Sequence, residues 1–288
     1  MTTIEDYKAP RSLEEAAEIL RGGNVTILAG GTDLMPQTRA GARHFAPVLM
    51  NIRRVKELAG IVEEGGIVRL GAGVTVTELL QSALVRGRLN LLWQACDHFA
   101  SDQIRNAATI GGNLCNASPA GDTLVPLLAL EAQVVLASKP NGTLQTRRVP
   151  LNEFFAGPGR TCRAPAELLT AVEVPLPPAG FAGAFYKHGT RPALDISTIS
   201  IAAGMRREGN VMRDVRIAFG AVAPTPIRAP RTEAALEGRA ADVAAIEAAA
   251  QAALEDAMPI SDVRASDWYR RELIRNMLKR VLSHVCQL

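Results

Sequence analysis

Apolar residues recur every three or four positions near the start of the chain, which predicts a helix over residues 13–21. Ser12 and Glu15 stand three residues apart at its beginning, as in a capping box. A glycine pair at 22–23 predicts the end of this helix. The β-branched run over residues 24–29 then predicts a short strand that leads into a second glycine pair.

Shorter apolar segments follow, some with the spacing of a helix and some with the alternation of a strand. Alternation across residues 61–76 predicts a hairpin turned at Gly65 and Gly66. The remaining expected elements are helices at 78–84 (capped by Thr77) and 89–100, a short buried helix that leads into a strand over 123–138, and strands around 143–149 and 167–174.

A proline-rich segment at residues 175–181 predicts a domain boundary near residue 176. Beyond it, the pattern predicts three antiparallel strands and two helical runs, at 181–188, 196–207, 212–223, 231–258 and 266–285. Strands and helices are thus grouped rather than alternating, which is typical of an α+β protein and not of an alternating parallel-sheet chain.

Composition narrows the class of protein. The 288 residues are 48% hydrophobic and 21% charged, with a formal net charge of +3 and no basic run, so a nucleic-acid partner is not expected. No apolar segment approaches the roughly 20 residues of a membrane span. The first residues lack the pattern of a secretory signal, and we expect a cytoplasmic protein.

The four cysteines and four histidines are scattered, without CxxC or HExxH spacing. This spacing predicts no zinc site, no local iron–sulfur cluster and no disulfide framework, so no metal ligand is assigned. Any redox chemistry would need an organic cofactor or another subunit. The cysteines are Cys96, Cys115, Cys162 and Cys286.

Two glycine pairs carry the candidate binding chemistry, within LAGGTD (28–33) and TIGGN (109–113). Glycine lets main-chain N–H groups converge on phosphate oxygens, and Thr32 and Thr109 can add hydroxyl donors. Neither a P-loop nor the GxGxxG of a Rossmann fold is present. We therefore predict two loops that close on one phosphorylated organic ligand, although Asx residues near them equally suit turns and caps.

The glycine motifs also carry a family resemblance. LAGGTDL followed by TIGGNLCNASPAGDT resembles the FAD-binding medium subunits of the molybdenum hydroxylases, of the xanthine dehydrogenase and carbon monoxide dehydrogenase type. Later blocks are similar to that family in the same order, so the resemblance covers nearly the whole chain: AELLTAVEVP, FYKHGTRPALDIS, GAVAPTPIRAPRTEAALEG and DWYRRELIRNMLKRVL.

The resemblance implies a two-lobed FAD-binding fold of the vanillyl-alcohol-oxidase/PCMH type. It would occupy residues 1–176, with an N-terminal lobe at about 1–56 and a middle lobe at about 57–176. A C-terminal flavoprotein lobe of α/β character, with a three-stranded antiparallel sheet and helices, would occupy 177–288.

The resemblance also implies which residues hold FAD. One loop would wrap the pyrophosphate through backbone amides, and the second would close from the other side. The first comprises Leu28, Ala29, Gly30, Gly31, Thr32, Asp33 and Leu34, and the second Thr109, Ile110, Gly111, Gly112 and Asn113.

Four further positions match cofactor contacts of the family. Asn116 and Asp122 match residues that bond sugar or ribitol hydroxyls, and Leu169 matches an apolar residue beside the flavin ring. Lys187 matches a lysine near the ring and the electron acceptor, which makes it a possible acceptor-side residue. No residue is assigned as catalytic.

The implied function is electron transfer within a larger oxidoreductase. A small subunit with [2Fe–2S] clusters would deliver electrons to FAD here, and a large subunit would hold the molybdopterin cofactor. NAD+, a quinone or another acceptor would receive the electrons, and a dimer of heterotrimers is expected. No [4Fe–4S] cluster is expected in this chain, because Cys115 and Cys162 lie far apart. Relatives similar to carbon monoxide dehydrogenase commonly have a His-Ser pair where this chain has Thr32-Asp33. The difference favours the xanthine-dehydrogenase-like branch of the family.

Two alternatives stay open. One is a stand-alone FAD-dependent oxidase of the vanillyl-alcohol-oxidase-like fold, in which His44 would have to tether the flavin. The other is a non-catalytic nucleotide-binding module. The sequence does not indicate the substrate of the complex. It also gives His188, beside Lys187, no particular role.

Overall fold

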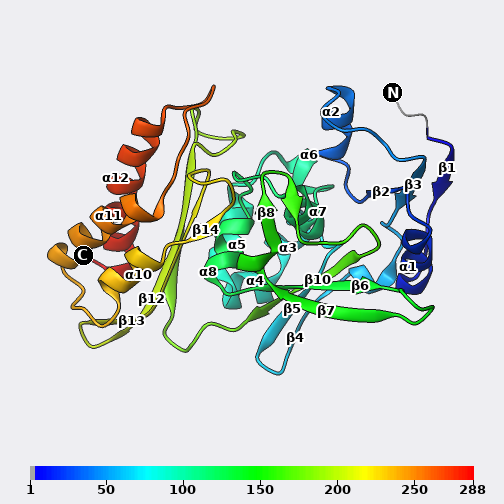
Figure 1. The fold of residues 1–288 in the computed structure, drawn as a ribbon. Helices are drawn as coiled ribbons and strands as arrows, with labels where there is room; N and C mark the ends of the chain where they lie inside the picture. Colours follow the sequence, from blue (N-terminus) through cyan, green and yellow to red (C-terminus); the bar gives the residue numbers. More distant parts are fainter. Residues whose placement is uncertain (1–3) are drawn as a thin grey trace.

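The computed structural model describes residues 4–288. The molecule is elongated, and its three larger sheets follow one another along it (Figure 1). We call the units built around them the N-terminal lobe (4–58), the middle lobe (61–175) and the C-terminal lobe (182–286). The two ends of the chain lie at opposite ends of the molecule. The domain boundaries at about residues 56 and 176 stay predictions.

The N-terminal lobe is a small parallel sheet with the strand order β1-β3-β2. Its helices alternate with its strands, so the expectation that the chain has no alternating parallel sheet is wrong for this lobe. The strands are only three or four residues long, too short for a clear periodic signal. The elements are β1 (Asp6–Lys8), α1 (Leu13–Arg21), β2 (Val25–Leu28), α2 (Leu34–Arg39), β3 (Val48–Asn51) and the 3-10 helix η1 (Lys56–Leu58).

Local signals in this lobe are confirmed at α1. Ser12 caps the helix by accepting from the backbone N–H of Glu15, and Gly22 stands at its C-cap. The Glu15 carboxylate, however, accepts from Arg11 N at 2.8 Å rather than from Ser12. The buried face of α1 consists of Ala16, Ala17 and Leu20.

The middle lobe contains a five-stranded antiparallel sheet with the order β4-β5-β10-β6-β7. The predicted hairpin is confirmed, because Gly65 and Gly66 both have positive φ between β4 and β5. A separate two-stranded hairpin, β8–β9, belongs to the same lobe. The strands are β4 (Ile61–Glu64), β5 (Ile67–Gly71), β6 (Gln133–Ser138), β7 (Gln145–Pro150), β8 (Phe155–Gly157), β9 (Arg160–Thr161) and β10 (Leu168–Pro175).

Seven short helices belong to the middle lobe. Thr75, not Thr77, caps the first of them and forms a complete capping box with Glu78, so the predicted cap is wrong by two residues. α8 is buried along its whole length. The helices are α3 (Val76–Gln81), α4 (Ala83–Arg88), α5 (Asn90–Asp97), α6 (Asp102–Arg105), α7 (Ile110–Asn116), α8 (Leu124–Ala129) and α9 (Leu151–Phe154).

The C-terminal lobe is an antiparallel sheet with three helices. The three predicted strands are present, and a two-residue fourth strand extends the order to β11-β12-β13-β14. The predicted helical run over 231–258 is interrupted at 237–242, because the chain turns at Gly238 with positive φ. The elements are β11 (Ala182–His188), β12 (Ile199–Glu208), β13 (Val211–Gly220), β14 (Ile227–Arg228), α10 (Pro230–Leu236), α11 (Val243–Asp256) and α12 (Asp267–Cys286).

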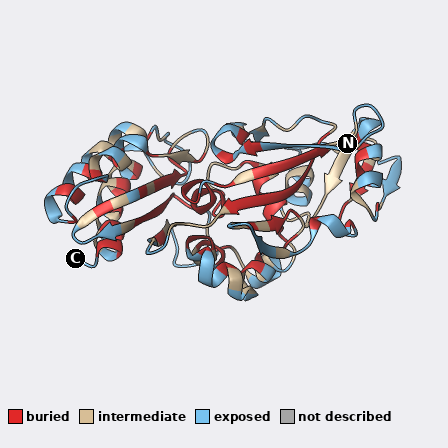
Figure 2. Ribbon diagram, turned by 90° about the horizontal axis from the view of Figure 1, so that it is seen from below, coloured by how far each residue is buried: buried red, intermediate tan, exposed pale blue. Residues whose placement is uncertain are grey.

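The two central strands of this sheet are largely buried, β12 over its first seven residues and β13 over its last four, and Figure 2 shows red strand segments in this part of the molecule. Ile201 and Ala203 on β12 pack into the core shared with the helices of the lobe. Ala202, between them, packs into the core of the middle lobe, where α8 lies against β12 and β13. The strand alternation therefore attaches the two lobes through a continuous apolar contact.

Gln94 on α5 covers the edge of β11. Its Oε1 accepts from Phe185 N at 2.8 Å, and its Nε2 donates to Gly183 O at 3.2 Å. The side-chain amide thus occupies the place of a neighbouring strand and satisfies two backbone groups that an edge strand would leave unpaired.

Replacement of Gln94 by methionine, which has a similar volume, is expected to lower the free energy of unfolding by about 1–3 kcal/mol, because two backbone groups lose their partners. Urea unfolding followed by circular dichroism measures this. Gln251→Met, at an exposed position of α11, is the matched control and should stay within about 0.5 kcal/mol of the parent. Equal midpoints for the two variants would show that Gln94 contributes nothing to lobe attachment.

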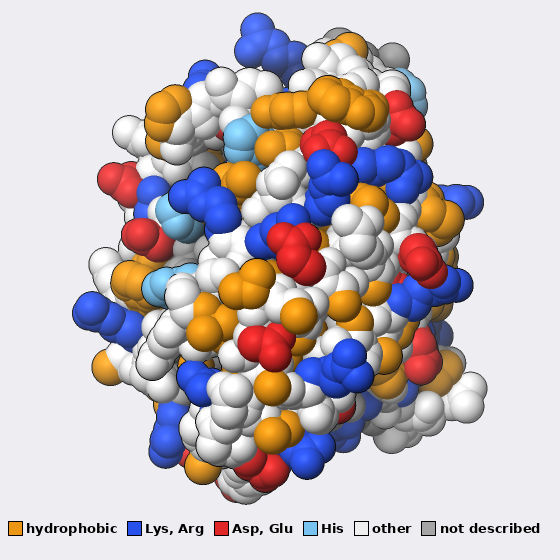
Figure 3. Space-filling model, turned by 90° about the vertical axis from the view of Figure 1, so that its left-hand side faces the viewer, with side chains coloured by type: hydrophobic (Ala, Val, Ile, Leu, Met, Phe, Trp, Pro, Cys, Tyr) orange, Lys and Arg blue, Asp and Glu red, His pale blue; other side chains and the backbone are white. Residues whose placement is uncertain are grey.

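The end of the molecule formed by the C-terminal lobe mixes acidic, basic and apolar side chains (Figure 3). Within residues 4–288, no helix combines the length and the hydropathy that crossing a bilayer requires.

Candidate functional site

A cavity of about 680 Å³ lies where the N-terminal and middle lobes meet, and both glycine motifs open onto it. Its size is in the range of small-molecule and cofactor sites. The predicted residues that line it are Ala29, Gly30, Gly31, Thr32, Asp33, Leu34, Thr109, Gly111, Gly112, Asn113, Asn116 and Leu169.

The first glycine motif connects β2 to α2 and presents free main-chain donors. Gly31 has φ +74°, a conformation that glycine adopts without steric cost. None of the backbone N–H groups of residues 30–34 donates a hydrogen bond to another described residue. Successive free N–H groups in such a turn form a concave site for an anion.

Gly30 is required by a contact inside the protein. A Cβ atom at Gly30 would lie 1.8 Å from Ala107 O, just before the second motif. A Cβ atom at Gly111 would lie 2.7 Å from the Cβ atom and 2.8 Å from the carbonyl oxygen of Ala72. Both glycines therefore allow segments of the chain to approach each other closely, a role in packing that is separate from the predicted approach of a phosphate.

The second motif is the first turn of α7, not a loop. Thr109 caps it by accepting from Gly112 N at 3.0 Å. Ile110 N and Gly111 N, each at 2.9 Å, donate to carbonyls of the β5–α3 connection. The prediction that this motif supplies main-chain donors to a ligand is therefore wrong, because these N–H groups are already bonded within the protein.

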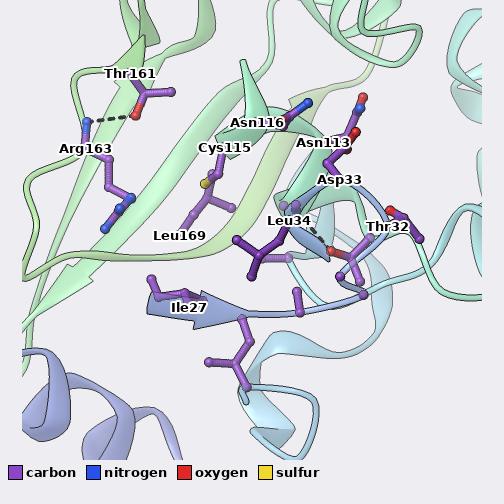
Figure 4. A pocket seen from close by; sticks show the side chains of 18 of the residues that line it. Ile27, Thr32, Asp33, Leu34, Asn113, Cys115, Asn116, Thr161, Arg163 and Leu169 are labelled. Carbon is purple, nitrogen blue, oxygen red and sulfur yellow. Dashed lines mark hydrogen bonds between the residues drawn. The ribbon is translucent and has the colours of Figure 1, made fainter. Parts of the chain in front are cut away.

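Polar side chains of α7 face the cavity beside the backbone of Gly111 and Gly112. Asn113 and Asn116 lie on the same side as Thr32 and Asp33, while Arg163 lies across from them (Figure 4). Asn116 Oδ1 accepts from Gln37 Nε2 at 2.9 Å, which links α7 to α2 across the two lobes. Leu169, on β10, contributes apolar wall, as does Phe99, which was not predicted.

Basic side chains gather at the cavity although they are far apart in the sequence. Arg163 is held by two carbonyl oxygens, and Asp33 is the single carboxylate among the described lining residues. Desolvation in the cavity wall raises the pKa of Asp33, although its side chain still reaches solvent, and nearby Arg43 opposes the rise. No local signal marks the unpredicted arginines, which are Arg43, Arg160 and Arg163, whereas His44, expected only as a possible flavin tether, also lines the cavity.

Four predicted residues do not line the cavity. Leu28 lies in β2 and Ile110 is buried in the core. Lys187 Nζ lies 2.6 Å from Asp122 Oδ2, and Ser197 Oγ donates to Asp122 Oδ1 at 2.7 Å. These last three residues form a buried link between the middle and C-terminal lobes. A direct role of Asp122 and Lys187 at the flavin stays a prediction.

The Lys187 ammonium also donates to His98 O, at 3.3 Å. Burial raises the pKa of Asp122, and the adjacent Lys187 opposes that rise. In residues 4–288, no three or more His, Cys, Asp or Glu side chains come together in a group suited to a metal ion.

Two family models match the chain in succession. Residues 2–177 match the FAD binding domain in molybdopterin dehydrogenase, and residues 184–285 match the CO dehydrogenase flavoprotein C-terminal domain.

Full-length relatives support the same assignment. A putative xanthine dehydrogenase FAD-binding subunit of Escherichia coli (strain K12) is 35% identical over 98% of this chain and 96% of its own length. The carbon monoxide dehydrogenase medium chain of Hydrogenophaga pseudoflava is 36% identical over 96% of both chains. A solved structure of carbon monoxide dehydrogenase from that organism, lacking the Mo-pyranopterin moiety of its cofactor, aligns with a TM-score of 0.92 at 36% identity, over 98% of this chain and 97% of the other.

Proposed function

The chain belongs to the family of FAD-binding medium subunits of xanthine dehydrogenase and carbon monoxide dehydrogenase, and we propose that it holds FAD in the cavity between its N-terminal and middle lobes. It is thus an oxidoreductase component with the mixed two-part fold expected from the resemblance. The free N–H groups of residues 30–34 carry the proposal, because no described group of the protein uses them.

The lining residues fit FAD. The N–H groups of residues 30–34 suit the diphosphate, and the arginines around the cavity offset its negative charge. Asp33 can accept from sugar hydroxyls, and Leu169 and Phe99 offer apolar surface to a ring. When bound, FAD supplies the electron-storing chemistry, while these residues bind it, orient it and limit the access of water.

We propose that this subunit transfers electrons and does not itself hydroxylate the substrate. Electrons would come from [2Fe–2S] clusters of a small partner subunit, a large partner would hold the molybdopterin cofactor, and NAD+, a quinone or another acceptor would take the electrons. The names of the relatives support such a complex. We further propose a dimer of heterotrimers in the cytoplasm and the division into residues 1–176 and 177–288.

A second candidate is a self-contained flavin oxidase. It is favoured by one observation, that His44 lines the cavity and would be available as a tether. Flavin that stays attached to the denatured chain in mass spectrometry would support this candidate.

Native purification of the chain from its source tests the main proposal. We expect co-purified iron and molybdenum and a yellow preparation that releases FAD on denaturation. In thermal unfolding of the isolated chain, FAD at a hundredfold excess over its dissociation constant should add about 2.7 kcal/mol of stability. A preparation that stays colourless after FAD is added would refute FAD binding, and the absence of both metals would refute the complex.

A further inference from the structure

The Asn113 side chain is held from behind by a buried threonine. Thr123, fully buried between α7 and α8, donates from Oγ1 to Asn113 Oδ1 at 2.7 Å. Asn113 itself is 9% exposed and lines the cavity. This hydrogen bond is the sole one that the Thr123 hydroxyl makes within the described chain.

That single bond determines which way the amide faces. If the amide were turned round, its nitrogen would donate to Thr123, and the hydroxyl hydrogen would have no acceptor. A fully buried hydroxyl without an acceptor is costly, so the carbonyl oxygen of Asn113 must face Thr123.

The Asn113 nitrogen is therefore left for the cavity. Nδ2 donates to no described residue, and it is not among the side-chain atoms sealed from solvent without a partner. The backbone N–H groups of residues 110–113 all donate inside the protein. The Asn113 side-chain amide is thus a donor that α7 can offer a ligand in the cavity (Figure 4).

We propose that Thr123 is a positioning residue that fixes Asn113 as a hydrogen-bond donor to an oxygen acceptor of the bound cofactor. The inference rests on the proposed binding of FAD and adds a residue that touches no ligand. Asn116 shows a similar arrangement, since its Oδ1 accepts from Gln37 and its Nδ2 donates to no described residue.

The test measures FAD dissociation constants of the apo-protein by fluorescence quenching. Thr123→Val removes the hydroxyl at nearly constant shape and should weaken FAD binding about tenfold, because the amide loses its fixed orientation. Thr123→Ser keeps the hydroxyl and should stay within about threefold of the parent. In an Asn113→Ala background, Thr123→Val should change affinity by less than about twofold, since the group it orients is absent.

Asn113→Asp separates orientation from folding. The carboxylate can still accept from Thr123, so the melting temperature should stay close to that of the parent, but the donor is lost and FAD should bind about a hundredfold more weakly. Unchanged affinity in this variant would mean that an oxygen already faced the ligand, and would overturn the inference even if Thr123→Val fails to fold.

Thr232→Val is the matched control. Thr232 is equally buried and donates to Asp256 Oδ2 at 2.7 Å, but it lies in α10 of the C-terminal lobe. It should lose stability and keep the parental affinity for FAD. If the parent protein binds no FAD, the proposed function is refuted. If the parent binds FAD but Thr123→Val binds it equally tightly, only the role of Thr123 is refuted.

Discussion

Gly30→Ala is expected to abolish FAD retention and to lower the free energy of unfolding by at least about 3 kcal/mol. The added methyl group would lie 1.8 Å from Ala107 O and 2.6 Å from the Ala107 carbonyl carbon. Both are backbone atoms, so no side-chain rotation relieves the overlap, and either the β2–α2 turn or the segment before α7 must move. Urea unfolding and the flavin content after gel filtration measure the two effects.

Gly87→Ala is the matched control for this change. Gly87 lies within α4, and a Cβ atom there would meet nothing within 4 Å. Alanine should therefore be neutral or add up to about 1 kcal/mol through helix propensity. If Gly30→Ala behaves like Gly87→Ala, the close approach of the two glycine segments is not what holds the cavity together.

Lys187→Met is expected to lower the free energy of unfolding at pH 7 by about 3–5 kcal/mol, because it leaves the Asp122 carboxylate buried without its counter-charge. The same variant should loosen the attachment of the C-terminal lobe, since Lys187 and Ser197 belong to that lobe and Asp122 to the middle lobe. Denaturant titration measures the loss, and hydrogen exchange across β11 and β12 locates it.

The loss should depend on pH. Burial raises the pKa of Asp122 in the folded state, and removal of Lys187 takes away the strongest of the groups that oppose the rise. A folded-state pKa above the unfolded value favours the folded state at low pH, and this contribution is lost as the pH rises through the folded pKa. The Lys187→Met variant should therefore recover stability, relative to the parent, as the pH is lowered from 7.

Two further variants complete this experiment. Lys187→Met combined with Asp122→Asn removes both charges and should recover a large part of the loss. Arg231→Met breaks an exposed ion pair with Glu255 and should cost no more than about 1 kcal/mol. A Lys187→Met variant as stable as Arg231→Met would show that the buried pair does not join the lobes.

Several elements could be predicted because their signals are local. The helix at Ser12 and the hairpin at Gly65-Gly66 depend on caps and turns within a few residues. The cap of α3 has a local signal too, since Thr75 and Glu78 have the spacing of a capping box, and this spacing identifies the cap better than the position of Thr77 next to the expected helix. The parallel sheet of the N-terminal lobe was missed because its strands hold too few residues to show a period.

The sequence predicted the two glycine motifs of the candidate site, but not which of their backbone N–H groups are left without a partner in the protein. The glycine pairs do line one cavity, as expected. Their roles differ, however, since the first leaves its N–H groups free and the second bonds them to the β5–α3 connection. That connection lies more than thirty residues earlier in the chain, and no local pattern indicates it.

The amino-acid sequence alone thus determined the family, the order of most helices and strands, and the two short motifs of the site, because these depend on residue identity and on near neighbours. The tertiary structure decided which donors stay free, which glycines are needed by packing, and which distant arginines share the cavity with them. A hydrogen bond between remote segments leaves no trace in spacing or composition, yet it determines which polar groups are left for a ligand.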